Sequence, residues 1–306
     1  MFKHTLDNKR YHTLNYYYKT KYNSKVFKVS LNTGLSCPNK INGKGCIFCS
    51  DKGSGDFAGN ACDDVITQFN KIKEIMHKKW PNAKYIGYFQ ANTNTFAPVS
   101  KLKELFEPIL KLDNVVGLNI ATRSDAISNE CLDYLIDLNK RTDLTIELGL
   151  QSIHESTLKF IRRGHTLENF NECVKKLKDN NIKLVVHIIN GLPYETKEMM
   201  IDTVKYLNSL NINGIKIHML HILKNTELAD IYKQEKFHIL TKKEYIDIVI
   251  EQLEHLNEKI VINRITGDPK LDDLIEPTWL LKKFCVLNDI DKEMVKKNTF
   301  QGKRVN

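Results

Sequence analysis

Three cysteines stand close together in CPNKINGKGCIFCS, at positions 37–50. Cys37 is followed by eight residues and Cys46, and Cys49 comes after two more. Thiolates are soft ligands that suit iron–sulfur clusters, zinc and copper(I). The spacing therefore predicts a metal centre with Cys37, Cys46 and Cys49 as its ligands.

The number of ligands separates the possible centres. A structural zinc site closes with four ligands, and the next cysteine, Cys62, comes thirteen residues after Cys49 without a CxxC partner. Three cysteines would leave one iron of a [4Fe–4S] cluster open for chemistry. A thioredoxin-type redox pair at Cys46 and Cys49 is a third interpretation, which needs a helix N-terminus there and gives Cys37 no role. The remaining cysteines fall in helical patterns and are expected to be buried small hydrophobes: Cys131, Cys173 and Cys285.

Short β-branched runs alternate with amphipathic stretches along the rest of the chain. The runs predict six strands and a seventh, at 26–32, 85–90, 115–121, 144–150, 182–189, 214–220 and 259–265. Helical spacing of apolar residues predicts helices between them, for example around 65–80, 170–177, 200–210 and 245–256. Strands that alternate with helices indicate βαβ units and a parallel sheet.

Six or so such units predict an α/β fold with a full or partial barrel. The whole chain, 1–306, is expected to be one domain with a core barrel at about 24–235 and an extension at about 236–306. The cysteine loop follows the first strand, which places it at the carboxyl-end mouth where barrel active sites form.

The predicted strands carry polar side chains on one face. Period-two alternation puts Lys28 opposite Val29, and Glu147 and Gln151 opposite Ile146. Lys216 and His218 share a face too, and so do Asn119 and Arg123. A closed barrel fills its interior with branched apolar side chains. A polar interior instead indicates a wet or ligand-filled cavity, with a few satisfied core polar groups as the alternative.

The cysteine loop after the first strand of a βα barrel resembles that of the radical S-adenosylmethionine (SAM) superfamily. Further stretches resemble the YhcC/YtqA-type proteins of that superfamily, which are relatives of the Elongator catalytic subunit. These stretches run in order over nearly the whole chain: YHTLNYY (11–17), VFKVSLNTGLSCPN (26–39), GSGDFAG (53–59), YFQANTNT (88–95), IATRSDAI (120–127), ELGLQSIHESTL (147–158), RRGHT (162–166), HIINGLPYET (187–196), KIHMLHILKNT (216–226), RITGD (264–268) and EPTWLLKK (276–283).

The resemblance implies a partial (β/α)6 TIM-like barrel of the radical SAM type with N-terminal and C-terminal helical extensions. It also implies a [4Fe–4S] cluster on Cys37, Cys46 and Cys49, with SAM on the open iron. Reductive cleavage of SAM would give a 5′-deoxyadenosyl radical that abstracts a substrate hydrogen. Phe48 would flank the adenine. The loop between the first two cysteines is shorter here than in many relatives.

Other SAM contacts are implied at the ends of the strands. Gln90, Ala91 and Asn92 stand where many relatives carry Gly-Gly-Glu, which binds the SAM amino group. Glu147 and Gln151 are candidate ribose or methionine contacts. Arg163 is a candidate for a bidentate pair with the SAM carboxylate, with Arg162, His165 and a simple basic surface turn as alternatives.

The charge of the chain is concentrated at its ends. The net charge is +9, of which +6 falls in 1–30 and +4 in 282–306. Basic ends could hold a polyanion such as nucleic acid, and Tyr16, Tyr17 and Tyr18 could stack on bases or cover the barrel. A Lys- and Asn-rich surface of the kind that AT-rich genomes give is the other interpretation.

The expected function is a radical SAM enzyme that acts on the C5 side chain of the wobble uridine of tRNA, for example from carboxymethylaminomethyl to aminomethyl. A flavodoxin- or ferredoxin-type protein would supply electrons. A radical SAM enzyme on a small-molecule or protein substrate and a zinc-stabilised RNA-binding protein are the alternatives. About forty residues follow position 265, too few for an acetyltransferase domain. No apolar run predicts a membrane span or secretory signal, so a cytoplasmic location is expected.

Overall fold

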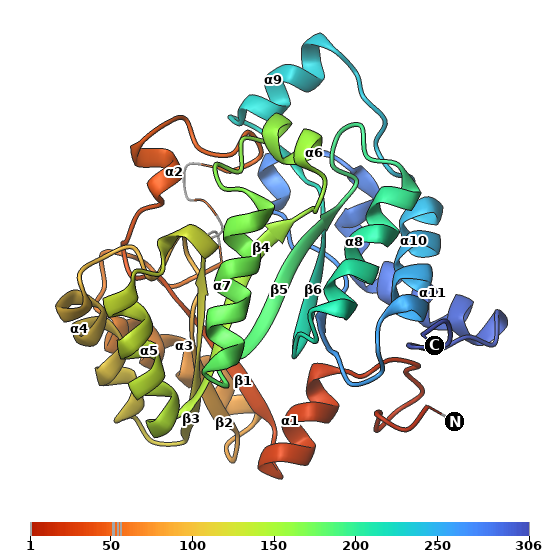
Figure 1. The fold of residues 1–306 in the computed structure, drawn as a ribbon. Helices are drawn as coiled ribbons and strands as arrows, with labels where there is room; N and C mark the ends of the chain where they lie inside the picture. The colour runs from red at the N-terminus through yellow and green to blue at the C-terminus, as the bar shows by residue number, and fades with distance from the viewer. Residues whose placement is uncertain (1, 51–52, 54, 56, 306) are drawn as a thin grey trace.

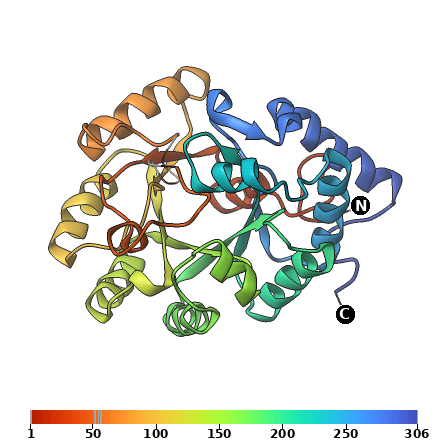
Figure 2. The same ribbon diagram turned by 90° about the horizontal axis from the view of Figure 1, so that it is seen from above.

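The computed structural model describes residues 2–50, 53, 55 and 57–305. Its centre is a sheet in the order β1-β2-β3-β4-β5-β6-β8, in which every neighbouring pair is parallel. The sheet curves into a half-barrel with helices around its outer side, as Figures 1 and 2 show. The strands are β1 (Val26–Leu31), β2 (Lys84–Phe89), β3 (Val115–Thr122), β4 (Asp143–Gln151), β5 (Lys183–Asn190), β6 (Gly214–Met219) and β8 (Val261–Arg264). The predicted partial TIM-like barrel and all seven strands are confirmed.

The helices on the outer side connect these strands. They are α3 (Val65–Lys79), α4 (Val99–Leu110), α5 (Asn129–Arg141), α7 (Leu167–Asp179), α8 (Lys197–Ser209) and α10 (Lys242–His255). The helix α9 (Glu227–Gln234) instead lies above the carboxyl ends of the strands (Figure 1). Polar caps fix where several of them begin. The Asp64 side chain accepts hydrogen bonds from the first turn of α3, and Thr241 and Glu244 form a capping box on α10. Such caps satisfy the free N–H groups of a helix start.

The apolar core lies between the sheet and the helices. Val29 and Leu31 of β1 and Ile146 and Leu148 of β4 are fully buried there. Alternate residues of the same strands point to the inside of the half-barrel, as period-two alternation requires. The helices therefore cover the apolar face, and the polar face is left for the interior.

The N-terminal helix α1 (Leu14–Tyr22) lies below the amino ends of the strands (Figure 1). Tyr18 is buried there against Val26 and Ile86, so this tyrosine covers the barrel. The basic residues of α1, Lys19 and Lys21, share this position, at the far end of the sheet from the cysteine loop. These two lysines of the basic N-terminal segment are thus remote from the mouth of the barrel.

The C-terminal extension contributes to the same sheet through β8, which pairs with β6. The short strands β7 (Ile222–Leu223) and β9 (Leu274–Glu276) form an antiparallel pair, and α11 (Lys283–Lys296) packs on α10. Residues 54 and 56 of the GSGDFAG stretch lie outside the described part. Within that part, no helix has the length and apolar character needed to cross a membrane.

Candidate active site

The cysteine loop begins directly after β1. Cys37 is the N-cap of α2 (Pro38–Ile41), a single helical turn. Gly45 has a φ of +76°, a conformation that favours glycine, and its N–H donates to the Asn39 carbonyl at 3.0 Å. The eight residues between Cys37 and Cys46 therefore form one turn that returns sharply to the second cysteine.

Cys46 and Cys49 lie on a tight turn, in which the Cys49 N–H donates to the Cys46 carbonyl at 3.1 Å. This turn is not the start of a helix, so the condition for a thioredoxin-type pair is not met. The Asn39 amide nitrogen lies 3.4 Å from the Cys46 sulfur and 2.7 Å from the Arg162 carbonyl. A hydrogen bond from Cys49, with help from Arg123 and Asn39 and against the effect of burial, lowers the pKa of Cys46 to about 7.

All three cysteines line one cavity of about 210 Å³, here called the cluster cavity. Among the described residues, no three His, Cys, Asp or Glu side chains are arranged to hold a single metal ion. A [4Fe–4S] cluster makes a different demand, since each cysteine binds its own iron. Three soft thiols that face one cavity, one of them already accepting an N–H hydrogen bond, fit such a cluster.

A larger cavity of about 960 Å³ adjoins the cluster cavity. The two share part of their lining, including Phe48, Cys49, Gln151 and Arg264. Its outer part is lined by exposed apolar side chains, among them Leu281 and Phe284. The cluster cavity therefore opens onto a space with room for a small molecule or a single nucleotide.

Most of the predicted SAM contacts are brought together around these cavities. Phe48, Gln90 and Gln151 line both cavities, and Asn92 lines the cluster cavity. Ala91 is fully buried and is not among the described residues that line either cavity. Their roles toward SAM remain predictions.

Gln151 has an unusual local structure. Its φ is +64°, at the irregular end of β4 where the pairing with β5 shifts. Its Oε1 atom is buried and has no hydrogen-bond partner among the described residues. Left-handed backbone at a residue other than glycine costs free energy and gathers at functional sites. An unpaired amide oxygen beside both cavities is suited to bind a polar group of a ligand.

The arginines of the RRGHT stretch have separate environments. The Arg163 guanidinium is buried and donates to the Leu150 carbonyl at 2.8 Å and to the His165 carbonyl at 2.7 and 3.0 Å. Arg163 also lines the cluster cavity, so its role toward the SAM carboxylate stays a prediction. Arg162 forms an ion pair with Glu227. Burial and Arg163 lower the pKa of His165 to about 3, which keeps that ring neutral.

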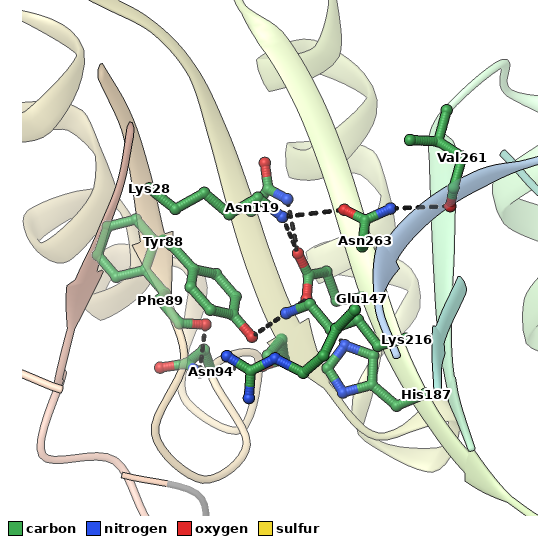
Figure 3. Close-up of polar contacts among 12 residues, drawn as sticks. Lys28, Tyr88, Phe89, Asn94, Asn119, Glu147, His187, Lys216, Val261 and Asn263 are labelled. Carbon is green, nitrogen blue, oxygen red and sulfur yellow. Dashed lines mark hydrogen bonds and ion pairs between the residues drawn. The ribbon is translucent and has the colours of Figure 1, made fainter. Parts of the chain in front are cut away.

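Glu147 is the centre of a polar network inside the half-barrel (Figure 3). One carboxylate oxygen accepts from Lys28 at 2.9 Å and from Asn119 at 2.6 Å. The other lies 2.5 Å from the Lys216 ammonium and 2.8 Å from His187. The predicted polar interior is confirmed, and four side chains already engage the carboxylate that was expected to contact SAM.

The network contains more positive than negative charge. Burial alone would raise the pKa of Glu147, but Lys216 and Lys28 outweigh it and hold that pKa well below its ordinary value. Burial lowers the pKa of Lys216 to about 7 although Glu147 opposes the change. Burial, with Lys216, also lowers the pKa of His187 to about 4. One carboxylate pairs with two lysines. The excess of positive charge disfavours protonation of the histidines and favours the binding of a negatively charged group.

Several residues at the site escape the sequence reasoning. His187 and Tyr88 lie on interior faces of their strands, where the same alternation that selected Lys216 would have found them. Asn39 and Arg264 follow no such pattern, because a loop and a strand end place them. The sequence placed Arg123 on the same face as Asn119 but assigned it no contact. In the structure its guanidinium donates to both carboxylate oxygens of Asp125, at 2.8 and 2.9 Å.

The remaining cysteines divide into two groups. Cys131 and Cys173 are buried, as predicted. Cys285 is exposed and lines the large cavity, so that prediction is wrong: the helical pattern of α11 does not turn this residue toward the core. Cys62 is exposed and is not among the described residues that line either cavity.

Comparison with known proteins agrees with this geometry. The sequence profile of the radical SAM superfamily matches residues 31–207, and that of the radical SAM C-terminal domain matches residues 212–296. Protein YtqA of Bacillus subtilis is 47% identical over 99% of this chain and 95% of its own length. The tRNA uridine(34) acetyltransferase of Methanocaldococcus jannaschii is 28% identical over 44% of this chain, which is 25% of that protein.

The fold is similar to that of a solved archaeal protein. The structure of Methanocaldococcus infernus Elp3, with an N-terminal deletion, superposes with a TM-score of 0.69 over 91% of this chain and 64% of that one, at 20% identity. At this identity the likeness concerns the fold. Family membership implies a [4Fe–4S] cluster and SAM, and it favours the cluster over a zinc site at the three cysteines. The chain belongs to the radical SAM superfamily and, within it, to the group of proteins that includes YtqA.

Proposed function

We propose that this radical SAM enzyme modifies the C5 side chain of the wobble uridine of tRNA, with carboxymethylaminomethyl as the substrate group and aminomethyl as the product group. The observation that carries the proposal is the large cavity of about 960 Å³ beside the three cysteines. It lies within the ~300–1,000 Å³ range of small-ligand sites. A cavity of this size admits one nucleotide that has left its stack, and enzymes that act on bases use such extrusion.

The relatives support the choice of substrate. The similarity to a tRNA uridine(34) acetyltransferase covers part of the radical SAM region. That protein is named for a reaction at the same nucleoside. A shared radical SAM part beside different remaining sequence is consistent with a shared position of attack and a different outcome.

Residues of this chain would hold the cofactors. Cys37, Cys46 and Cys49 would bind the cluster, and Phe48 lies between the two cavities where an adenine ring could pack. When bound, the cluster and SAM supply a 5′-deoxyadenosyl radical that abstracts a hydrogen atom. Gln90 and Gln151 line both cavities and would position the polar parts of SAM.

The substrate group suits hydrogen abstraction. Its CH₂ lies between an amine nitrogen and a carboxylate, and a carbon radical next to nitrogen is stabilised. Loss of one further electron from that radical, to a one-electron acceptor of the flavodoxin or ferredoxin type, would give an imine. Addition of one water to the imine would then break the C–N bond, leave the aminomethyl group on the uridine and release the two carbons as glyoxylate. A flavodoxin- or ferredoxin-type protein is the proposed electron donor.

A direct assay tests the substrate. Anaerobically reconstituted enzyme would be given SAM, dithionite and tRNA from cells that lack this gene, and 5′-deoxyadenosine would be counted. Stimulation by this tRNA, and little by tRNA from wild-type cells, is expected because only the former carries unreacted wobble uridines. Equal yields with both tRNAs and with none would contradict the proposal and favour a small-molecule or protein substrate.

A further inference from the structure

The wall of the large cavity carries a group of polar side chains that the radical chemistry does not use. Arg264 ends β8, and His218 and His221 come from β6 and the segment after it. They belong to the stretches KIHMLH and RITGD, which the sequence analysis singled out and to which no role was assigned. Here they are called the basic wall.

The histidines of the basic wall have unused hydrogen-bonding capacity. The Nε2 atoms of His218 and His221 are shielded from solvent and have no partner among the described residues. Buried polar atoms are nearly always paired, so each exception calls for a ligand or another explanation. Both side chains line the large cavity, which points to a ligand there that can pair with them.

His221 is held close to the backbone of the neighbouring segment. A Cβ atom built at Gly267 would lie 2.2 Å from His221 Nε2, which is too close for any side chain. Gly267 therefore leaves the space that the ring occupies. The position of the ring depends on a glycine of the RITGD stretch, which ties the two stretches into one structure.

Arg264 is only partly engaged. Its guanidinium contacts Asp268 at 3.3 Å, and its side chain is 36% exposed. A guanidinium carries five N–H donors in a planar fork that matches carboxylate and phosphate groups. Because this is its single contact among the described residues, Arg264 keeps N–H donors available for a ligand that enters the large cavity.

Charge favours an anion at this place. The charged side chains of the described part that line the large cavity are Arg264, Lys282 and Asp268, which leaves one positive charge in excess. The nearby carboxylate of Glu147 is already engaged by two lysines, Asn119 and His187. A ligand that brings negative charge would meet donors and no free carboxylate from Glu147.

We propose that Arg264, His218 and His221 bind an anionic oxygen group of the substrate, so that the substrate is recognised by its negative charge. On the proposed function, on which this inference rests for its substrate, that group is the carboxylate of the carboxymethyl arm or the phosphate of the extruded nucleotide. The carboxylate held here is bonded directly to the CH₂ that loses its hydrogen. The product group lacks this carboxylate, so the same wall would favour substrate over product.

Small probes test the basic wall without tRNA. Binding to the anaerobically reconstituted enzyme would be measured calorimetrically for two matched pairs, N-benzoylglycine against N-benzoylglycinamide and uridine 5′-monophosphate against uridine. We expect one anionic probe to bind roughly tenfold or more tightly than its neutral partner, since hydrogen bonds to charged groups are among the strong ones. The pair that shows the preference identifies carboxylate or phosphate as the group.

Variants assign the preference to these residues. Arg264→Gln should abolish it, Arg264→Lys should keep part of it, and His218→Gln should weaken it. Arg141→Gln is the matched control, because Arg141 is similarly exposed at 41% and pairs with Glu107 on the surface. Circular dichroism and iron content check that each variant folds. If Arg264→Gln does not fold, the result for His218→Gln decides the inference.

Each outcome decides the inference. It is overturned if the wild-type enzyme prefers neither anionic probe, or if the preference survives in Arg264→Gln or, where that variant does not fold, in His218→Gln. A preference that depends on Arg264 supports it even if tRNA does not stimulate SAM cleavage, in which case only the proposed function fails. A tRNA-dependent reaction without any anion preference would agree with the proposed function and would contradict the anion-binding role of the basic wall.

Discussion

Glu147 and Lys216 face each other inside the half-barrel, with 2.5 Å between the carboxylate Oε2 and the ammonium Nζ. Glu147 is fully buried, and Lys216 also donates to the Tyr88 hydroxyl at 2.8 Å (Figure 3). The pair lies on β4 and β6, with β5 and its His187 between them. One carboxylate thereby organises polar groups from four strands around the base of the cavities.

Glu147→Gln should lower the free energy of unfolding by about 3–5 kcal/mol, because it leaves Lys28 and Lys216 buried without a compensating charge. Urea unfolding of the anaerobic protein measures this. Glu107→Gln is the control, since Glu107 pairs with Arg141 at the surface, and it should cost no more than about 1 kcal/mol. Equal losses in the two variants would show that the network adds no more than a surface pair.

Acidification should destabilise the protein through His187. Its pKa is lowered to about 4 in the fold and is about 6.5 when unfolded. The unfolded chain therefore binds the proton first as the pH falls, and stability is lost below about pH 6.5. Between pH 7.5 and 5.5 this one group contributes a loss of about 1.4 kcal/mol.

His187→Gln tests that assignment, because glutamine keeps an N–H donor for Glu147 but does not titrate. Urea unfolding at pH 7.5, 6.5 and 5.5 should show a shallower pH dependence in the variant, by about the same 1.4 kcal/mol. His238→Gln is the matched control, since His238 is exposed and pairs with Glu244 at the surface. An unchanged slope in His187→Gln would mean that the pKa of His187 is the same in the folded and unfolded protein.

The three cysteines of the loop should be distinguishable from the other cysteines by iron content. Cys46→Ser should lose most of the iron and all SAM cleavage, because a cluster ligand is gone. Cys62→Ser should retain both, since Cys62 is exposed and is not a described lining residue of either cavity. Iron and sulfide analysis of anaerobically purified protein measures the difference. Loss of iron in Cys62→Ser would give that cysteine a role that the structure does not indicate.

Gln151→Ala should weaken SAM binding by about three- to tenfold, the effect of one lost hydrogen bond of ~0.5–1.5 kcal/mol. Its stability should change little, because Gln151 Oε1 has no partner among the described residues and the φ of +64° is kept. Equilibrium dialysis with SAM and urea unfolding separate the two effects. A stability loss with unchanged SAM affinity would assign Gln151 to the fold alone.

The sequence predicted the sheet well because parallel strands with helical connections leave a strong local pattern. Alternation on β1, β4 and β6 also placed Lys28, Glu147 and Lys216 inside the barrel before any contact was known. Their joint network could not be predicted, because it depends on the register between strands that are distant in sequence.

The loops were harder to predict from the sequence. Asn39 meets Cys46 only because a glycine turn brings residues of the loop back together. Arg264 reaches the large cavity because β8 pairs with β6, which the sequence left as a seventh strand without a place in the order. Cys285 was expected inside and is exposed, since helical periodicity does not show which face of a terminal helix meets the core.

The most direct test of the account is the nucleoside composition of tRNA from cells with and without this gene. We predict that a deletion strain accumulates the carboxymethylaminomethyl form of wobble uridine and loses products that derive from the aminomethyl form. The wild-type gene should restore the profile, Cys62→Ser should restore it too, and Cys46→Ser should not. A wobble-uridine profile that is unchanged by the deletion would contradict the proposed function.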